Sequence, residues 1–180
     1  MPVEIDWFFI LTQALGLCGI LCGAIAFQCK KHSNIMLFRT VNELLFAIQY
    51  LLLGAYTGMA MDLIGCLRNQ LFASQIKRNK STLLTQIIFC IIFLIGGIAT
   101  WSGYISILAI TAKLLSTVAY SLKNTKILRL IILTTSSCWL VYNAMVSSWA
   151  GVLCEVFTLS SIVISLFRFY ILPKLKKRTS

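Results

Sequence analysis

The chain has 180 residues, of which 59% are hydrophobic and 12% are charged, and its formal net charge is +11. A soluble domain carries about 25% charged residues to cover its surface. This composition therefore excludes a soluble enzyme and predicts an integral membrane protein. The positive charge does not indicate a nucleic-acid partner, because the basic residues fall in short clusters between apolar runs and form no continuous basic face.

Apolar runs long enough to cross a bilayer, about 20 residues each, follow one another along almost the whole chain. We expect an all-α bundle of seven transmembrane helices near residues 8–28, 34–53, 57–76, 82–100, 103–122, 126–145 and 149–171. Strands are not expected, because a membrane barrel shows alternating segments of about ten residues. The first run follows acidic residues and lacks a small-residue cleavage site, so it is interpreted as a retained helix and not as a signal peptide.

Basic residues mark every second connection between these helices. They are Lys30, Lys31, Lys77, Arg78, Lys80, Lys123, Lys126, Lys174, Lys176, Lys177 and Arg178. The N-terminus and the connections near 54–57, 100–103 and 145–149 carry none. Since cytoplasmic loops are enriched in lysine and arginine, this alternation predicts an N-terminus outside the membrane and a C-terminus in the cytoplasm.

An internal repeat is visible when the chain is aligned with itself at an offset of 93 residues. Similar residues then coincide within the helices, among them the pairs Phe27/Tyr120, Phe46/Trp139, Tyr56/Trp149, Gly58/Gly151 and Asp62/Glu155. We therefore expect a first three-helix repeat over residues 1–81, a linker helix over 82–100, and a second three-helix repeat with a basic tail over 101–180. Because the linker crosses the membrane once, the two repeats are parallel.

Several charged residues lie within the expected helices. Three of the five acids do so, namely Glu43, Asp62 and Glu155, together with Arg68 and Lys113. A charge at the centre of a membrane helix costs about 2.5–3.5 kcal/mol on insertion scales, so such residues face the protein interior or water. Polar and aromatic residues also recur at helical spacing around them, which predicts a central cavity between the two halves.

The predicted substrate site is formed by two aromatic rings and two acids, with four further polar residues lining or tuning it. These residues are Phe46, Asp62, Trp139 and Glu155, and then Asn42, Glu43, Asn143 and Lys113. A carboxylate placed there binds a cation or an amine, or carries a proton, and the rings cover a flat or apolar face of the ligand. The alternative is that the acids form structural ion pairs with Lys113, Arg39 and Arg68.

Other kinds of site are less well supported. The chain has seven cysteines and one histidine, His32, and Cys18 and Cys22 are interpreted as packing residues and not as metal ligands. We expect no catalytic residues, no metal and no cofactor, and an intramembrane carboxylate pair with enzymatic activity is disfavoured. Arg68 and Arg168 are expected to extend toward the cytoplasmic face. Gly19 and Gly23 form a surface for close helix contact, within the bundle or between protomers.

Three segments carry a family resemblance. The pattern QxxGxxGxxxGxxAF runs from Gln13 to Phe27, and segments 51–69 and 138–168 continue it. Together they resemble the YgjV-like bacterial inner membrane proteins over nearly the whole chain. This resemblance implies a multi-pass protein of the bacterial cytoplasmic (inner) membrane, but no particular activity.

The 3+1+3 layout also resembles the SWEET and PQ-loop transporters, the PnuC transporters and the KDEL receptors. In SWEET-like proteins an aromatic residue and an asparagine of each repeat flank the substrate, and Phe46 with Asp62 and Trp139 with Glu155 occupy similar places. The acids depart from that pattern, as does Gln28, which follows Phe27 where the family has a proline.

These features predict a small-molecule transporter that works by alternating access around a central aromatic and acidic site. The acids favour a cationic or proton-coupled substrate over a neutral sugar, with nucleosides and vitamin-like compounds also considered. The alternative is a non-transporting membrane receptor or scaffold with structural ion pairs. The expected partners are a small-molecule ligand and the lipid bilayer, and the sequence allows a homo-oligomer.

Overall fold

The computed structural model describes residues 6–28, 32–78, 80–121 and 125–167, and these residues form seven α-helices without strands. The helices are α1 (Trp7–Gln28), α2 (His32–Leu52), α3 (Tyr56–Lys77), α4 (Leu83–Ala99), α5 (Ser106–Ser121), α6 (Thr125–Met145) and α7 (Trp149–Leu166). Each coincides with one of the apolar runs of the sequence, so the all-α prediction is confirmed. The expected extension of the last helix to residue 171 lies outside the described residues.

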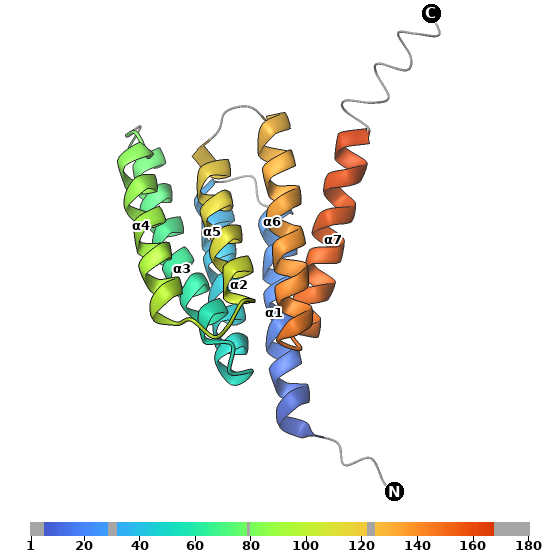
Figure 1. The fold of residues 1–180 in the computed structure, drawn as a ribbon. Helices are drawn as coiled ribbons and strands as arrows, with labels where there is room; N and C mark the ends of the chain where they lie inside the picture. Colours follow the sequence, from blue (N-terminus) through green and yellow to red (C-terminus); the bar gives the residue numbers. More distant parts are fainter. Residues whose placement is uncertain (1–5, 29–31, 79, 122–124, 168–180) are drawn as a thin grey trace, which may run out of the picture.

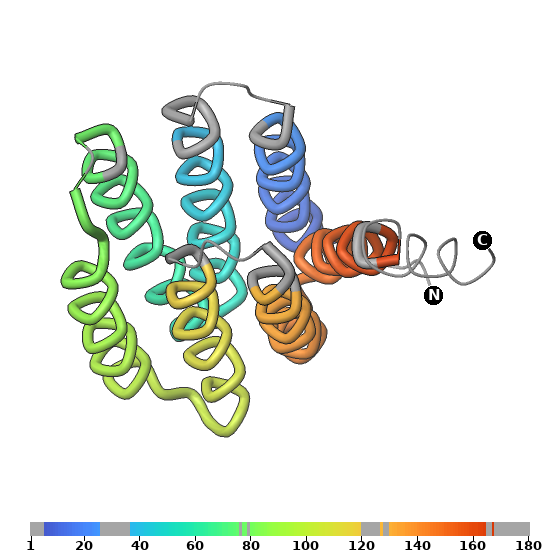
Figure 2. The backbone as a smooth tube through the Cα atoms, turned by 90° about the horizontal axis from the view of Figure 1, so that it is seen from above, coloured from blue at the N-terminus to red at the C-terminus, as the bar shows by residue number. Residues whose placement is uncertain are grey.

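The helices pack in two facing layers (Figure 2). In one layer α2 lies between α1 and α3, and in the other α6 lies between α5 and α7. Helix α1 lies beside α7 and α3 beside α5, while α4 packs against α3 and α5 at the edge of the bundle. The two middle helices, α2 and α6, therefore face each other across the centre of the molecule.

Successive helices run in opposite directions along the bundle (Figure 1). Helices α1, α3, α5 and α7 end at the same end of the molecule, and the exposed Lys77, Arg78 and Lys80 lie there at the α3–α4 connection. The connections α2–α3, α4–α5 and α6–α7 lie at the opposite end (Figure 1). We call this end, which carries Lys77, Arg78 and Lys80 among the described residues, the basic end.

Beside its hydrophobic core, the protein buries several large polar side chains and exposes many large apolar ones, which is unusual for a water-soluble protein. Gln49, Arg68 and Asn143 are among the largest fully buried side chains, whereas large apolar residues such as Leu84 and Ile98 are exposed. This arrangement is stable where the surroundings are apolar and the interior satisfies polar groups. Among the described residues, one helix segment, Trp7–Ile25 with a mean hydropathy of 2.1, is long and apolar enough by itself to cross a membrane.

Two connections at the end opposite the basic end have the same geometry. Gly54 between α2 and α3 has φ +70°, and Ser147 between α6 and α7 has φ +58°. The next residue in each turn donates a backbone hydrogen bond to the carbonyl five positions before it, from Ala55 to Tyr50 at 2.8 Å and from Ser148 to Asn143 at 2.9 Å. The two turns lie 93 residues apart, the offset at which the sequence repeats.

Small residues bring α1 close to α2. A Cβ atom added to Gly19 would lie 3.0 Å from the Phe46 ring, and one added to Gly23 would lie 3.3 Å from Nδ2 of Asn42. The Asn42 side chain also donates a hydrogen bond of 2.7 Å to the Gly19 carbonyl. The expected close-contact surface of α1 therefore packs within the bundle, and it holds two side chains of α2 in place.

Candidate functional site

A pocket of about 130 Å³ lies between the two layers of helices. Residues of α2, α3, α5, α6 and α7 line it, and all eight site residues predicted from the sequence are among them. They are Asn42, Glu43, Phe46, Asp62, Lys113, Trp139, Asn143 and Glu155. A cavity needs only about 10–15 Å³ to hold one water molecule, so this volume is sufficient for a small organic molecule.

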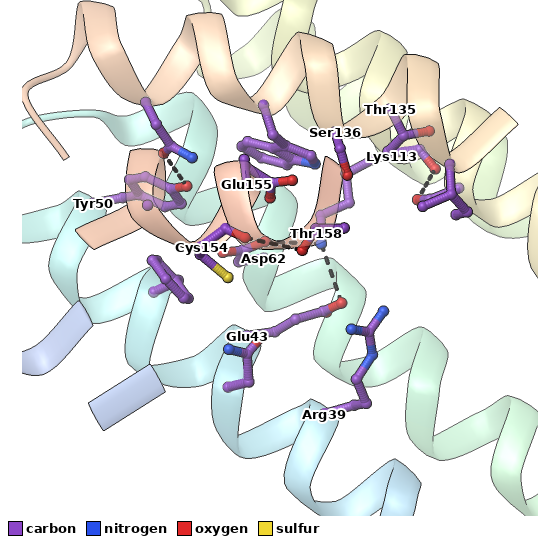
Figure 3. Close-up of a pocket in the computed structure, with 17 residues that line it drawn as sticks. Arg39, Glu43, Tyr50, Asp62, Lys113, Thr135, Ser136, Cys154, Glu155 and Thr158 are labelled. Carbon is purple, nitrogen blue, oxygen red and sulfur yellow. Dashed lines mark hydrogen bonds and ion pairs between the residues drawn. The ribbon is translucent and has the colours of Figure 1, made fainter. Parts of the chain in front are cut away.

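An ion-pair cluster forms the wall where α2, α3 and α5 meet (Figure 3). The Nζ atom of Lys113 lies 2.8 Å from Oδ1 of Asp62 and 3.4 Å from Oε1 of Glu43. Arg68 adds a second cation, 3.5 Å from the same oxygen of Glu43. Burying a single charge costs several kcal/mol, which only close opposite charges and hydrogen bonds offset. Two of the three predicted acids are therefore compensated within the protein.

Arg68 does not extend to the membrane surface, so that prediction is wrong. Its side chain is 1% exposed and lies between α3 and α5. The guanidinium donates hydrogen bonds to Asn69 at 3.0 Å and to Thr117 at 2.9 Å, and it lies 5.6 Å from the centre of the Phe93 ring. These partners and Glu43 make burial more favourable than extension along α3. The other arginine of this prediction, Arg168, lies outside the described residues.

Glu155 on α7 differs from the other two acids. It lines the pocket, but among the described residues it has no cation within the 4.0 Å of an ion pair. The Ser136 side chain is a polar neighbour of its carboxylate, and Arg39, Asp62 and Lys113 act on it electrostatically. Figure 3 shows its carboxylate on the wall formed by α7, near Ser136 of α6. Glu155 is therefore the acid of the pocket wall that has no ion pair among the described residues.

Aromatic rings form the wall of the pocket between α2 and α6. Tyr50 stacks on Trp139 with 6.0 Å between ring centres and an angle of 11° between the ring planes. The edge of Tyr142 meets both rings, at 5.7 and 5.4 Å, and Phe46 lies 6.1 Å from Tyr50. The ammonium of Lys113 lies 5.7 Å from the centre of the Trp139 ring, within the range of a cation–π interaction. The pocket thus combines carboxylates with ring faces, which suits cationic groups.

Hydrogen bonds between the two layers close the pocket at the end opposite the basic end. Tyr50 donates a bond of 2.6 Å to Asn143, and the Gly58 backbone N–H donates a bond of 2.7 Å to the Tyr142 hydroxyl. Gln49 accepts a bond of 3.2 Å from Ser148. We call the Tyr50–Asn143 contact the floor of the pocket. From this floor, the residues of α2 that line the pocket extend from Tyr50 to Arg39, about 16 Å along the helix toward the basic end.

Comparison with known protein families identifies the family of the chain. Residues 10–172 match the family model Imp-YgjV, which is described as bacterial inner membrane protein. The chain belongs to the Imp-YgjV family. The resemblance noted in the sequence is therefore confirmed, and the location is the bacterial inner membrane. No curated protein and no solved structure matches the chain.

The family assignment accounts for the distribution of side chains in this Imp-YgjV protein. Exposed apolar side chains and buried polar side chains are compatible with a location in the inner membrane, where the surroundings are apolar. For an inner membrane protein, a polar pocket inside the bundle is costly to maintain and is typical of a functional site.

The sequence interpretation missed part of the pocket wall of this Imp-YgjV protein. Tyr50, Ser116, Cys154 and Thr158 also line the pocket. A signal for Tyr50 was present, since it follows Phe46 by one helical turn and aligns with the predicted site residue Asn143 at the offset of 93. Ser116 follows Lys113 by three residues and could have been found in the same way.

Proposed function

We propose that this inner membrane protein transports a small molecule by alternating access of two three-helix halves. The halves are residues 1–81 and 101–180, joined by the linker helix over 82–100, and all seven helices cross the membrane. The N-terminus lies outside and the basic end lies in the cytoplasm. The substrate binds in the pocket between the halves, at Phe46, Asp62, Trp139 and Glu155, and it is cationic or coupled to protons.

The observation that carries this proposal is the composition of the pocket wall. Matching positions of the two halves line it together, namely Arg39 and Ile132, Asn42 and Thr135, Glu43 and Ser136, Phe46 and Trp139, Tyr50 and Asn143, and Asp62 and Glu155. A pocket built from both halves changes shape when one half moves relative to the other. Sites at the interface of repeats near the bilayer midplane are typical of secondary transporters.

The helix neighbours support the same interpretation. In the proposed repeat, α1 corresponds to α5 and α3 corresponds to α7. If the two halves are arranged symmetrically, the contact of α1 with α7 must have a counterpart between α5 and α3, and both contacts are present. The interlayer hydrogen bonds at the floor of the pocket belong to one state, in which the side opposite the basic end is closed. Rocking of the halves would break these bonds and open that side.

A ligand screen followed by an uptake assay tests the proposal. Detergent-purified protein is screened by thermal shift against amines, amino acids, nucleosides, vitamins and sugars between about pH 5 and pH 8. A ligand at 100 times its dissociation constant should stabilise the fold by about 2.7 kcal/mol. The ligand that gives the largest shift is then supplied, labelled, to proteoliposomes.

We expect saturable uptake that Glu155→Gln abolishes while the variant remains folded. Asp6→Asn serves as the control, because Asp6 is an exposed acid at the start of α1 and far from the pocket lining. Uptake that is unchanged in Glu155→Gln contradicts the proposed site. A labelled ligand that binds but never enters the proteoliposomes contradicts transport.

A second candidate function is supported by the ion-pair cluster. Since Lys113 and Arg68 already pair with Asp62 and Glu43, these charges would also be found in a receptor or scaffold that only needs a fixed helix arrangement. In that case no compound of the screen stabilises the protein. Asp62→Asn then lowers the stability strongly, whereas Glu155→Gln changes nothing that can be measured.

A further inference from the structure

The Lys113 ammonium on α5 occupies a defined environment at the contact of α5 with α3, where residues of both halves meet. It lies 2.8 Å from the carboxylate of Asp62 on α3 and 5.7 Å from the ring centre of Trp139 on α6. A second acid, Glu43 on α2, lies 3.4 Å away. An ammonium held by a carboxylate and a ring face is also how proteins bind amine ligands. The protein therefore contains its own example of an amine site.

The contact of α1 with α7, which corresponds to that of α5 with α3, carries matching residues without the amine. At the offset of 93, Asp62 corresponds to Glu155 and Trp139 to Phe46, and both of these residues line the pocket. Lys113 corresponds to Ile20 on α1, which carries no charge and packs against the hydrophobic core. Glu155 consequently has no ion pair among the described residues, although its counterpart Asp62 has one.

We propose that the carboxylate of Glu155 and the ring of Phe46 bind the ammonium group of a small external amine. The ligand's ammonium lies at the α1–α7 contact, in the place that corresponds to that of the Lys113 ammonium at the α5–α3 contact. This inference rests on the proposed transport site and narrows its substrate to compounds with an alkylammonium group. Asp62, which pairs with Lys113 inside the protein, then lines the pocket beside the ligand, and Glu155 is the acid that binds the ammonium.

The surroundings of Glu155 suit a ligand that binds reversibly. Glu43, the second acid beside Lys113, corresponds to Ser136, so the external site contains one carboxylate where the internal site contains two. One carboxylate neutralises one ammonium. Arg39 also lines the pocket and acts on Glu155, while Lys113 is held by Asp62 and Glu43. An amine that also carries a carboxylate would place this group toward Arg39.

Binding measurements with matched pairs of compounds test the proposal. The probes are choline against its uncharged isostere 3,3-dimethyl-1-butanol, ethanolamine against ethylene glycol, and glycine as a zwitterion. Calorimetric titration and thermal shift of the full-length purified protein give the affinities. We expect at least one amine to bind while its uncharged partner does not. Preference for glycine over the plain amines identifies a zwitterionic substrate, and the reverse identifies a simple amine.

Two substitutions locate the site. Glu155→Gln keeps the shape of the side chain and should weaken amine binding by roughly 30-fold or more, because the ammonium then loses the carboxylate that binds it. Ile20→Lys supplies a tethered ammonium at the α1–α7 contact and should abolish binding by filling the site, whereas Ile20→Met, of similar length and uncharged, should retain binding. If Ile20→Lys does not fold, Glu155→Gln and Ile20→Met still decide the question.

The outcomes separate this inference from the proposed function. Amine binding that depends on Glu155 without uptake into proteoliposomes supports the inference and contradicts transport. Uptake of an uncharged compound, with no amine bound, supports transport and overturns the inference. Amine binding that is unchanged in both Glu155→Gln and Ile20→Lys overturns the assignment of the site.

Discussion

The Tyr50 hydroxyl donates a hydrogen bond of 2.6 Å to Asn143 Oδ1, and the two residues lie 93 positions apart in the chain. The same offset relates Asp62 to Glu155 and Gly54 to Ser147 in the sequence. Residues at matching positions of two halves meet only where an axis relating the halves passes between them. The bond therefore marks the place at which the proposed halves touch, at the floor of the pocket.

Removal of this hydrogen bond should destabilise the contact between the layers. In Tyr50→Phe the ring and its stacking on Trp139 remain, but the buried Asn143 side chain loses its partner. An unsatisfied buried polar group costs about 1–3 kcal/mol. Thermal unfolding in detergent should detect this loss, and Tyr56→Phe, at an exposed position at the start of α3, should show none.

A double variant shows whether the loss comes from this bond. Asn143→Leu removes the orphaned amide, so Tyr50→Phe combined with Asn143→Leu should lose less stability than the sum of the two single changes. Strictly additive losses would mean that the two side chains act independently, and the contact between the halves would then lie elsewhere.

The helices were predictable because they depend on local features of the sequence. Continuous apolar runs of sufficient length, separated by short polar connections, predicted α1 to α7 close to their ends. The pocket residues were predictable for a related reason. Phe46 and Trp139 stand on polar faces at helical spacing, and a costly polar face must turn inward.

The choice of partners among the charges was not predictable. Whether Lys113 pairs with Asp62 or with Glu155 depends on which helix lies beside α5, and α5 lies beside α3. The burial of Arg68 depends on the same contact, because Thr117 of α5 and Glu43 of α2 supply its partners. A sequence pattern places charges on helix faces, but it does not say which faces meet.

The ion pair between Lys113 and Asp62 should be important for stability. Lys113→Met leaves Asp62 without its ion-pair partner, while Glu43 keeps its ion pair with Arg68. Removal of one partner of a buried pair costs about 3–5 kcal/mol. Lys113→Met should therefore unfold at a much lower temperature or denaturant concentration than the wild type, and Lys77→Met, at an exposed position, should not.

Removal of the Asp62 charge should restore part of this stability. In Lys113→Met combined with Asp62→Asn, the uncompensated charge is absent, and Glu43 still pairs with Arg68. We expect the double variant to be more stable than Lys113→Met alone. If it is less stable, the coupling between the two residues is not the interaction that the 2.8 Å distance indicates.

Arg68→Lys should be strongly destabilising although the charge is kept. The planar guanidinium donates hydrogen bonds to Asn69, Thr117 and Glu43 at the same time. The compact ammonium group of a lysine side chain does not reproduce this geometry. Leaving buried partners without donors costs about 1–3 kcal/mol each. The same substitution at the exposed Arg78 should leave thermal unfolding unchanged. Equal stability of Arg68→Lys and the wild type would mean that the side chain leaves the interior.

Single cysteines test the orientation of the bundle in the inner membrane. In a variant without native cysteines, Lys80→Cys places a thiol at the basic end and Ser102→Cys places one at the opposite end, and both positions are exposed. The excess of basic residues on the cytoplasmic side predicts that a membrane-impermeant maleimide labels Ser102→Cys in intact cells. Lys80→Cys should react only after the cells are permeabilised. Labelling of Lys80→Cys in intact cells would show that the bundle has the reverse orientation. The pocket, which is closed at the Tyr50–Asn143 hydrogen bond, would then extend toward the outside of the cell.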